Sequence, residues 1–119
     1  MLLDPRWSEK PQVTEEPWRD VLRRAAALVE EHGLAKHVQL DSKGRMCLHG
    51  AISIAATGSP YSGDLVTYRA DTAVRRYLEQ QGMVFGNPGG TGSAQWNNEP
   101  ERTQAEVVAA LRAAAEMPE

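Results

Sequence analysis

Apolar residues recur every three or four positions along most of this chain, and that spacing is typical of helices that bury one face. The first such stretch has an apolar stripe formed by Trp18, Leu22, Ala25 and Val29. Thr14 precedes the stretch at a capping position, and Gly33 follows it as a natural C-terminal stop. The pattern therefore predicts a first helix that follows Thr14 and ends at Gly33.

The same spacing predicts two helices in the middle of the chain. Residues 48–56 are apolar nearly all round, which is typical of a short helix at the centre of a small domain. The segment Thr57-Gly58-Ser59-Pro60 ends it. A longer helix is predicted from Asp64 or Thr67 to Gln81, with Gly82 as its stop.

The last helix has the clearest local signal in the sequence. Thr103 and Glu106 form a capping box, in which each side chain satisfies the free backbone amide of the other residue. Its apolar face is formed by Val107, Val108, Leu111 and Ala115. A helix is therefore predicted to begin at Thr103.

Between the first two helices, the sequence predicts a short hairpin. His37–Leu40 and Arg45–Cys47 read as strands, and Asp41-Ser42-Lys43-Gly44 reads as the turn that joins them. We therefore expect an α+β fold of about four helices packed around a short two-stranded hairpin, with the first and last helices packed together. Residues 1–13 are expected to form an extended N-terminal arm, and residues 14–116 a single globular domain.

Length and charge narrow the classes of function. The chain has 119 residues, which fits one domain, and its formal net charge of -3 argues against binding to nucleic acid or to an anionic membrane. Its single cysteine cannot form an internal disulfide. No leader sequence is apparent, and residues 51–56, the longest mostly apolar run, are far too short to span a membrane. We expect a cytoplasmic protein.

Several short motifs, in order and spacing, resemble those of a known family. They are Leu22–Gly33, Cys47-Leu48-His49-Gly50-Ala51, Tyr68-Arg69-Ala70, Trp96-Asn97-Asn98 and Arg102–Val107. Over residues 18–116 the chain resembles an uncharacterised family of small proteins found mainly in actinobacteria and their phages. The resemblance implies no activity and no catalytic residue. Asn98 stands where the family motif Trp-Asn-Asp has an acid, so no mechanism that needs a carboxylate there is implied.

Cys47 is the first candidate for chemistry. It lies where a strand is predicted to lead into a helix, and helix N-terminal amides lower the pKa of a thiol. His49 and His37 are expected nearby, and Asn97 or Asn98 would orient a histidine as in Cys-His-Asn hydrolases. The opposing interpretation is a buried, structural cysteine, which is the commoner role. Cys47, His37 and His49 lack the spacing of metal ligands, and no fourth ligand is evident. We therefore expect no metal and no cofactor.

The second candidate is the segment that precedes the last helix. Residues 86–93 are rich in glycine, but they lack the strand and helix context of a phosphate-binding loop. Trp96, Asn97 and Asn98 form either a ligand contact or a structural plug, in which the tryptophan fills the core and the amides tie down backbone.

The function most consistent with these features is a non-catalytic binding or regulatory module with an unknown protein or small-molecule partner. One alternative is a small cysteine-dependent enzyme centred on Cys47. Another is a protein that sequesters a small ligand through the glycine-rich loop and Trp96. Exposure of Cys47 beside a histidine favours the enzyme, whereas burial among aliphatic side chains favours the module.

Overall fold

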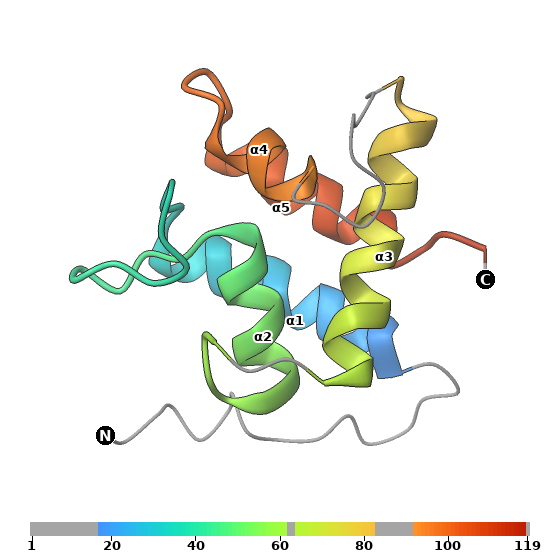
Figure 1. The fold of residues 1–119 in the computed structure, drawn as a ribbon, viewed down its shortest axis with the longest axis horizontal. Helices are drawn as coiled ribbons and strands as arrows, with labels where there is room; N and C mark the ends of the chain where they lie inside the picture. Colours follow the sequence, from blue (N-terminus) through green and yellow to red (C-terminus); the bar gives the residue numbers. More distant parts are fainter. Residues whose placement is uncertain (1–16, 62–63, 83–91, 119) are drawn as a thin grey trace.

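The computed structural model of this chain describes residues 17–61, 64–82 and 92–118. Its elements are five helices: α1 (Pro17–His32), α2 (Leu48–Thr57), α3 (Leu65–Gln80), α4 (Gly92–Asn98) and α5 (Gln104–Ala114) (Figure 1). Within these ranges there are no strands, so the predicted α+β fold is wrong and the described part is all-helical. None of the described helices is both long enough and apolar enough to cross a lipid bilayer.

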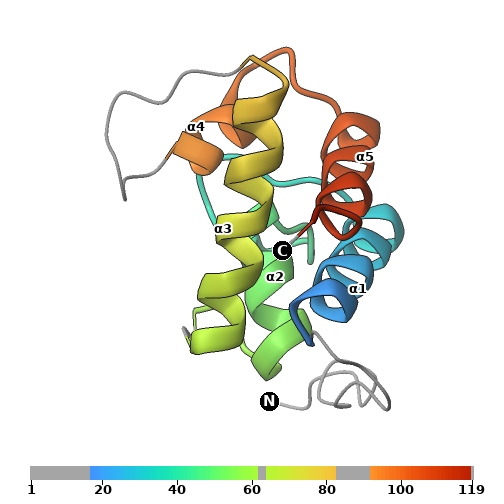
Figure 2. The same ribbon diagram turned by 90° about the vertical axis from the view of Figure 1, so that its right-hand side faces the viewer.

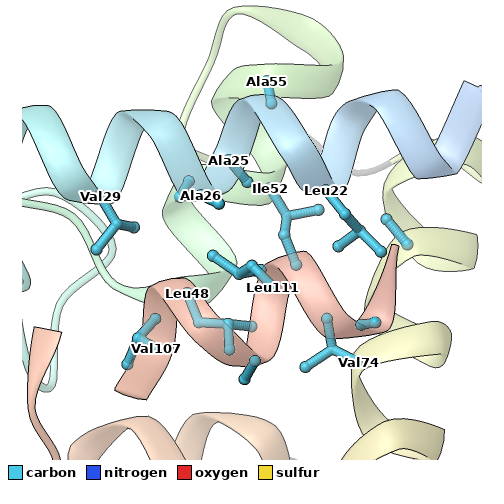
Figure 3. Close-up of a cluster of buried hydrophobic side chains, with 14 of the residues drawn as sticks. Leu22, Ala25, Ala26, Val29, Leu48, Ile52, Ala55, Val74, Val107 and Leu111 are labelled. Atoms are coloured by element: carbon cyan, nitrogen blue, oxygen red, sulfur yellow. The ribbon is translucent and has the colours of Figure 1, made fainter. Parts of the chain in front are cut away.

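Helix α1 organises the packing. It lies alongside α5 and also contacts α2 and α3, and Figure 2 shows α1 and α5 side by side at one flank of the molecule. The predicted pairing of the first and last helices is therefore confirmed. The core between them is built from small and branched apolar side chains, including Leu22, Ala26, Ile52, Val74 and Leu111 (Figure 3).

Helix α2 is the most enclosed element, as its apolar composition predicts. Every residue from Gly50 to Ala55 is buried, because α1, α3 and α4 all pack around it. Ile54 is fully buried for the same reason. The helix ends at Gly58, whose φ of 82° is the left-handed conformation that a glycine adopts without strain.

The predicted hairpin is present only as a turn. Asp41 N donates to Arg45 O (2.9 Å) and Gly44 N donates to Asp41 O (3.1 Å), so the turn forms where it was expected. The flanking residues make only isolated bridges, Leu34 with Met46 and Leu40 with Met46. His37 has a φ of 69°, and this left-handed conformation interrupts the extended backbone that a strand needs. The segment 33–47 is therefore an irregular loop over α2.

Helix ends agree with their local signals. Thr103 and Glu106 make both bonds of the capping box, with Glu106 N donating to Thr103 Oγ1 (3.1 Å) and Thr103 N donating to Glu106 Oε1 (2.9 Å). Asp64 Oδ1 caps α3 by accepting from Thr67 N (2.8 Å). Gly33 ends α1 with a φ of 103°.

Helix α4 was not predicted, since its residues were assigned to the glycine-rich loop and the segment after it. Its buried residues Ser93, Trp96 and Asn97 are mostly polar, so they give no apolar periodicity. The expected arm over residues 1–13, the Thr14 cap and most of the loop 86–93 lie outside the described residues.

Candidate functional site

A pocket of about 260 Å³ lies beside the N-terminus of α2. Its walls come from three separate parts of the chain: the irregular loop, the start of α2, and α4. The lining residues are His37, Val38, Gln39, Cys47, His49, Ala94, Asn97 and Asn98. We call it the Cys47 pocket. It brings together five of the six residues that the sequence singled out for chemistry or binding, all except Trp96.

Asn97 holds the three walls together. Its side chain is fully buried, and Oδ1 accepts a hydrogen bond from the backbone N of Leu48 at the start of α2 (3.0 Å). Its Nδ2 donates to Ala35 O (3.1 Å) and to Asn98 Oδ1 (3.2 Å). Both N–H donors of this amide and one of the two acceptor directions of its oxygen are thus used within the protein, which is typical of a buried structural group.

Asn98 differs from Asn97 because only the oxygen of its side-chain amide is hydrogen-bonded. Oδ1 accepts from His37 N (2.8 Å) as well as from Asn97 Nδ2. These two donors identify the oxygen and turn it towards the protein. The Nδ2 group has no acceptor among the residues that the structure describes. Asn98 therefore offers N–H donors at the edge of the pocket.

Cys47 caps α2 instead of acting as an exposed nucleophile. Its Sγ accepts a hydrogen bond from Gly50 N (3.4 Å), and only 7% of the residue is exposed. Burial raises the pKa of the Cys47 thiol above its ordinary value, and this effect outweighs the backbone N–H groups at the start of α2 that lower it. The thiol is thus held in its protonated form at neutral pH. The burial expected for a structural cysteine is confirmed, but the surroundings are the wall of a pocket and include two histidines.

Neither histidine is paired with this sulfur. His49 Nε2 lies 2.8 Å from Ser93 Oγ and 3.4 Å from Asp71 Oδ1, so this end of the ring points towards α4 and α3. Ser93 Oγ donates to the same Asp71 oxygen (3.2 Å). Among the described residues, no hydrogen bond joins the Cys47 sulfur to a ring nitrogen of either histidine. A nucleophile and base in hydrogen-bond contact, which cysteine catalysis requires, is absent from this arrangement.

Sequence reasoning missed Asp71 and Ser93 as partners of His49. They come from α3 and α4, and no local motif connects them to a residue at the start of α2. Trp96, which was predicted to act together with Asn97 and Asn98, does not line the Cys47 pocket. It lines a separate groove with Tyr77 and Leu78.

With this geometry established, the family can be assigned. The model of DUF6197, a family of unknown function, matches residues 13–117. The chain belongs to the DUF6197 family. No curated protein and no solved structure matches it. The matched range includes all of the residues that line the Cys47 pocket, so the pocket lies wholly within the DUF6197 domain.

Two further features of the DUF6197 domain bear on the sequence hypotheses. In the described ranges, no group of three or more His, Cys, Asp or Glu side chains is placed to hold a metal ion. The Trp96 ring packs under the guanidinium of Arg102, with the Arg102 Cζ atom 4.1 Å from the ring centroid, and Arg102 Nε donates to Trp96 O (3.1 Å). Trp96 therefore has a packing role between α4 and the start of α5.

Proposed function

We propose that this DUF6197 domain is a non-catalytic binding module whose ligand occupies the Cys47 pocket. The observation that carries the proposal is the division of its polar groups. Asn97, which holds the walls, has both its amide donors and its oxygen hydrogen-bonded within the protein, whereas Asn98 Nδ2, the His37 ring and the Gln39 amide have no partner within the described residues. The polar groups that hold such a pocket in shape are hydrogen-bonded within the protein, and other polar groups remain available to a ligand. The binding site is therefore preorganised.

The lining also indicates the class of ligand. None of the residues around the pocket is Asp, Glu, Lys or Arg, so no fixed charge favours an ionic group. The volume of about 260 Å³ suits a small molecule or a single side chain. We therefore propose a small uncharged ligand that carries hydrogen-bond acceptors for the Asn98 amide and an apolar part for Val38 and Ala94.

The position of Cys47 beside His37 and His49 is the observation that favours the alternative, a cysteine-dependent enzyme. Two facts favour the binding module over it. The pKa of the Cys47 thiol is raised by burial, whereas a catalytic thiol needs a lowered pKa. The Cys47 sulfur accepts from Gly50 N and makes no hydrogen bond to a histidine ring among the described residues.

The test is to fill the pocket and to measure binding of a library of small, uncharged amides and alcohols. Ala94→Trp places a large side chain in the pocket, while Gln95→Trp adds the same side chain to the exposed neighbouring position on α4 and serves as the matched control. Ligand-induced NMR shifts in the wild type should concentrate at residues 37–39, 47–49 and 94–98. Ala94→Trp should abolish them and Gln95→Trp should retain them.

Ala94→Leu provides a milder version if the tryptophan variant loses its helical circular dichroism. Binding that maps to another part of the domain would contradict the proposal. So would compounds that bind Ala94→Trp and the wild type equally well.

A further inference from the structure

The ring of His49 forms part of one wall of the Cys47 pocket and is held at one edge by two other helices. His49 Nε2 lies 2.8 Å from Ser93 Oγ on α4 and 3.4 Å from Asp71 Oδ1 on α3, and Ser93 Oγ donates to the same Asp71 oxygen (3.2 Å). Only 2% of Ser93 is exposed, so bulk water competes little for the bonds of its hydroxyl. The orientation of the ring is therefore set by groups that the proposed function does not use.

The hydrogen atoms of this cluster can be assigned by counting donors and acceptors. An ionised Asp71 carboxylate only accepts, and a serine hydroxyl has one hydrogen to donate. Because Ser93 gives that hydrogen to Asp71, its oxygen is left as an acceptor for His49 Nε2. The neutral ring therefore carries its hydrogen on Nε2, which leaves Nδ1 without a hydrogen and with a free lone pair.

The lone pair on His49 Nδ1 is available to another molecule. Among the described residues, no group donates to Nδ1, and this atom is not one of their enclosed polar atoms that lack a partner. The side chain is 28% exposed, and the residue lines the Cys47 pocket. The pocket thus combines an acceptor at His49 with the free N–H donors of Asn98.

We infer that His49 Nδ1 accepts a hydrogen bond from the ligand of the Cys47 pocket, and that Ser93 and Asp71 are positioning residues that hold the ring in the tautomer required for this bond. The inference rests on the proposed function and narrows its ligand. Besides an acceptor for Asn98 Nδ2, the ligand carries an N–H donor for His49. A carboxamide supplies both groups without a formal charge, so the ligand class is an uncharged amide with a small apolar substituent.

The tautomer can be measured in the full chain without any ligand. Long-range proton–nitrogen NMR spectra, recorded where the ring is neutral, should show the His49 hydrogen on Nε2. Asp71→Asn introduces an amide that can donate to Ser93 and so reverse the direction of the bonds, and it should move a large fraction of the ring to the form with hydrogen on Nδ1. Glu79→Gln removes a carboxylate from an exposed position of α3 and should leave the tautomer unchanged.

Binding can be measured with two compounds of nearly the same shape, N-methylisobutyramide and methyl isobutyrate. The ester keeps the carbonyl acceptor but has an oxygen in place of the amide N–H. In NMR titrations of the wild type, the amide should bind roughly tenfold more tightly than the ester, since the ester leaves His49 Nδ1 without a donor. Asp71→Asn should reduce this preference severalfold, and Glu79→Gln should retain it.

Other results would overturn the inference. A wild-type ring with its hydrogen on Nδ1, or a tautomer that does not respond to Asp71→Asn, would show that Ser93 and Asp71 do not set it. Equal binding of the amide and the ester in the Cys47 pocket would refute the acceptor role of His49 and leave the proposed function standing. If neither these compounds nor any other small uncharged molecule bound in the pocket, the proposed function would fail together with this inference.

Discussion

Helix α5 begins with a cap made from its own residues, whereas helix α2 begins with a cap that depends on α4. At α5, Thr103 and Glu106 exchange two hydrogen bonds at the exposed surface. At α2, the Cys47 sulfur accepts from Gly50 N, and Asn97, which is distant in the sequence, accepts from Leu48 N. Both arrangements satisfy free amides of a first turn, but only the second lies in the interior.

The difference shows what each cap contributes. The α5 cap stabilises one helix and can be lost without exposing the core. The α2 cap also fixes the position of α4 against the irregular loop, because Asn97 bonds to Ala35 as well. The walls of the Cys47 pocket are held by this second cap, so substitutions there should cost more stability than substitutions at α5.

The largest effect is expected from Gly50→Ala. An added Cβ at Gly50 would lie 2.0 Å from the Gln39 backbone oxygen, which cannot move without shifting the loop. We expect a loss of about 3 kcal/mol or more in the free energy of unfolding. Gly44→Ala is the comparison, because its Cβ meets nothing within 4 Å and only its φ of 82° is unfavourable, at a cost of about 1 to 2 kcal/mol. Chemical denaturation of both variants tests the order; equal losses would contradict it.

Asn97→Ala should come next. The substitution leaves the amide of Leu48 and the carbonyl of Ala35 without partners in the interior, at a cost of about 2 to 3 kcal/mol. Asn98→Ala, which removes only the bond to His37 N and the contact with Asn97, should cost about 1 kcal/mol. Faster hydrogen exchange at the Leu48 amide should accompany the first variant alone. A larger loss of stability in Asn98→Ala than in Asn97→Ala would contradict the role of Asn97 as a cap of α2.

Thr103→Ala should be milder than Gly50→Ala and Asn97→Ala. It removes the hydroxyl that accepts from Glu106 N, and loss of such a cap costs about 1 kcal/mol. Thr103→Ser keeps the oxygen and should restore most of the stability. The denaturation midpoints of the three proteins measure this, and a midpoint for Thr103→Ala within error of the wild type would refute it.

The two caps should weaken at opposite ends of the pH scale. The hydrogen bond from Thr103 N lowers the pKa of Glu106, so its stabilising effect is complete above the unfolded value of about 4.3 and is lost as the pH falls through the folded value. Burial raises the pKa of Cys47, so stability declines as the pH rises above the unfolded value of about 8.5. Glu106→Gln should flatten the acid side of the profile of unfolding free energy against pH, and Cys47→Ala the alkaline side. The account would be contradicted if Glu106→Gln changed the alkaline side of the profile and Cys47→Ala changed the acid side.

Sequence patterns predicted those features whose causes are local. The capping box at Thr103, the stop at Gly33 and the apolar helix over residues 48–56 each depend on neighbouring residues, and the structure confirms them. The hairpin failed because the left-handed conformation of His37 interrupts one strand. Histidine adopts this conformation more often than most residues, but the preference is too weak to predict it at one position. Helix α4 was missed because tertiary contacts, and not apolar periodicity, determine its burial.

The site was predicted in its members but not in its arrangement. Cys47, His37, His49, Asn97 and Asn98 were singled out and combined in the Cys-His-Asn hypothesis, and the fold places all five around one pocket without the hydrogen bonds of that hypothesis. The link from His49 to Ser93 and Asp71 joins three helices, and it decides that the Nε2 atom of this ring is not available to the sulfur. Distances between residues remote in sequence determine this chemistry, so no spacing motif could predict it.

The most direct test of a structural thiol in a binding pocket is the rate at which Cys47 is modified in the native protein. The chain has one cysteine, so a small soluble thiol reagent reports on this site alone. Between pH 5 and pH 10, we predict that native Cys47 reacts far more slowly than in the urea-unfolded chain at every pH, with a rate that rises only towards the alkaline end. Rapid modification of the native protein near pH 6 would contradict a structural Cys47 and would favour the cysteine-dependent enzyme.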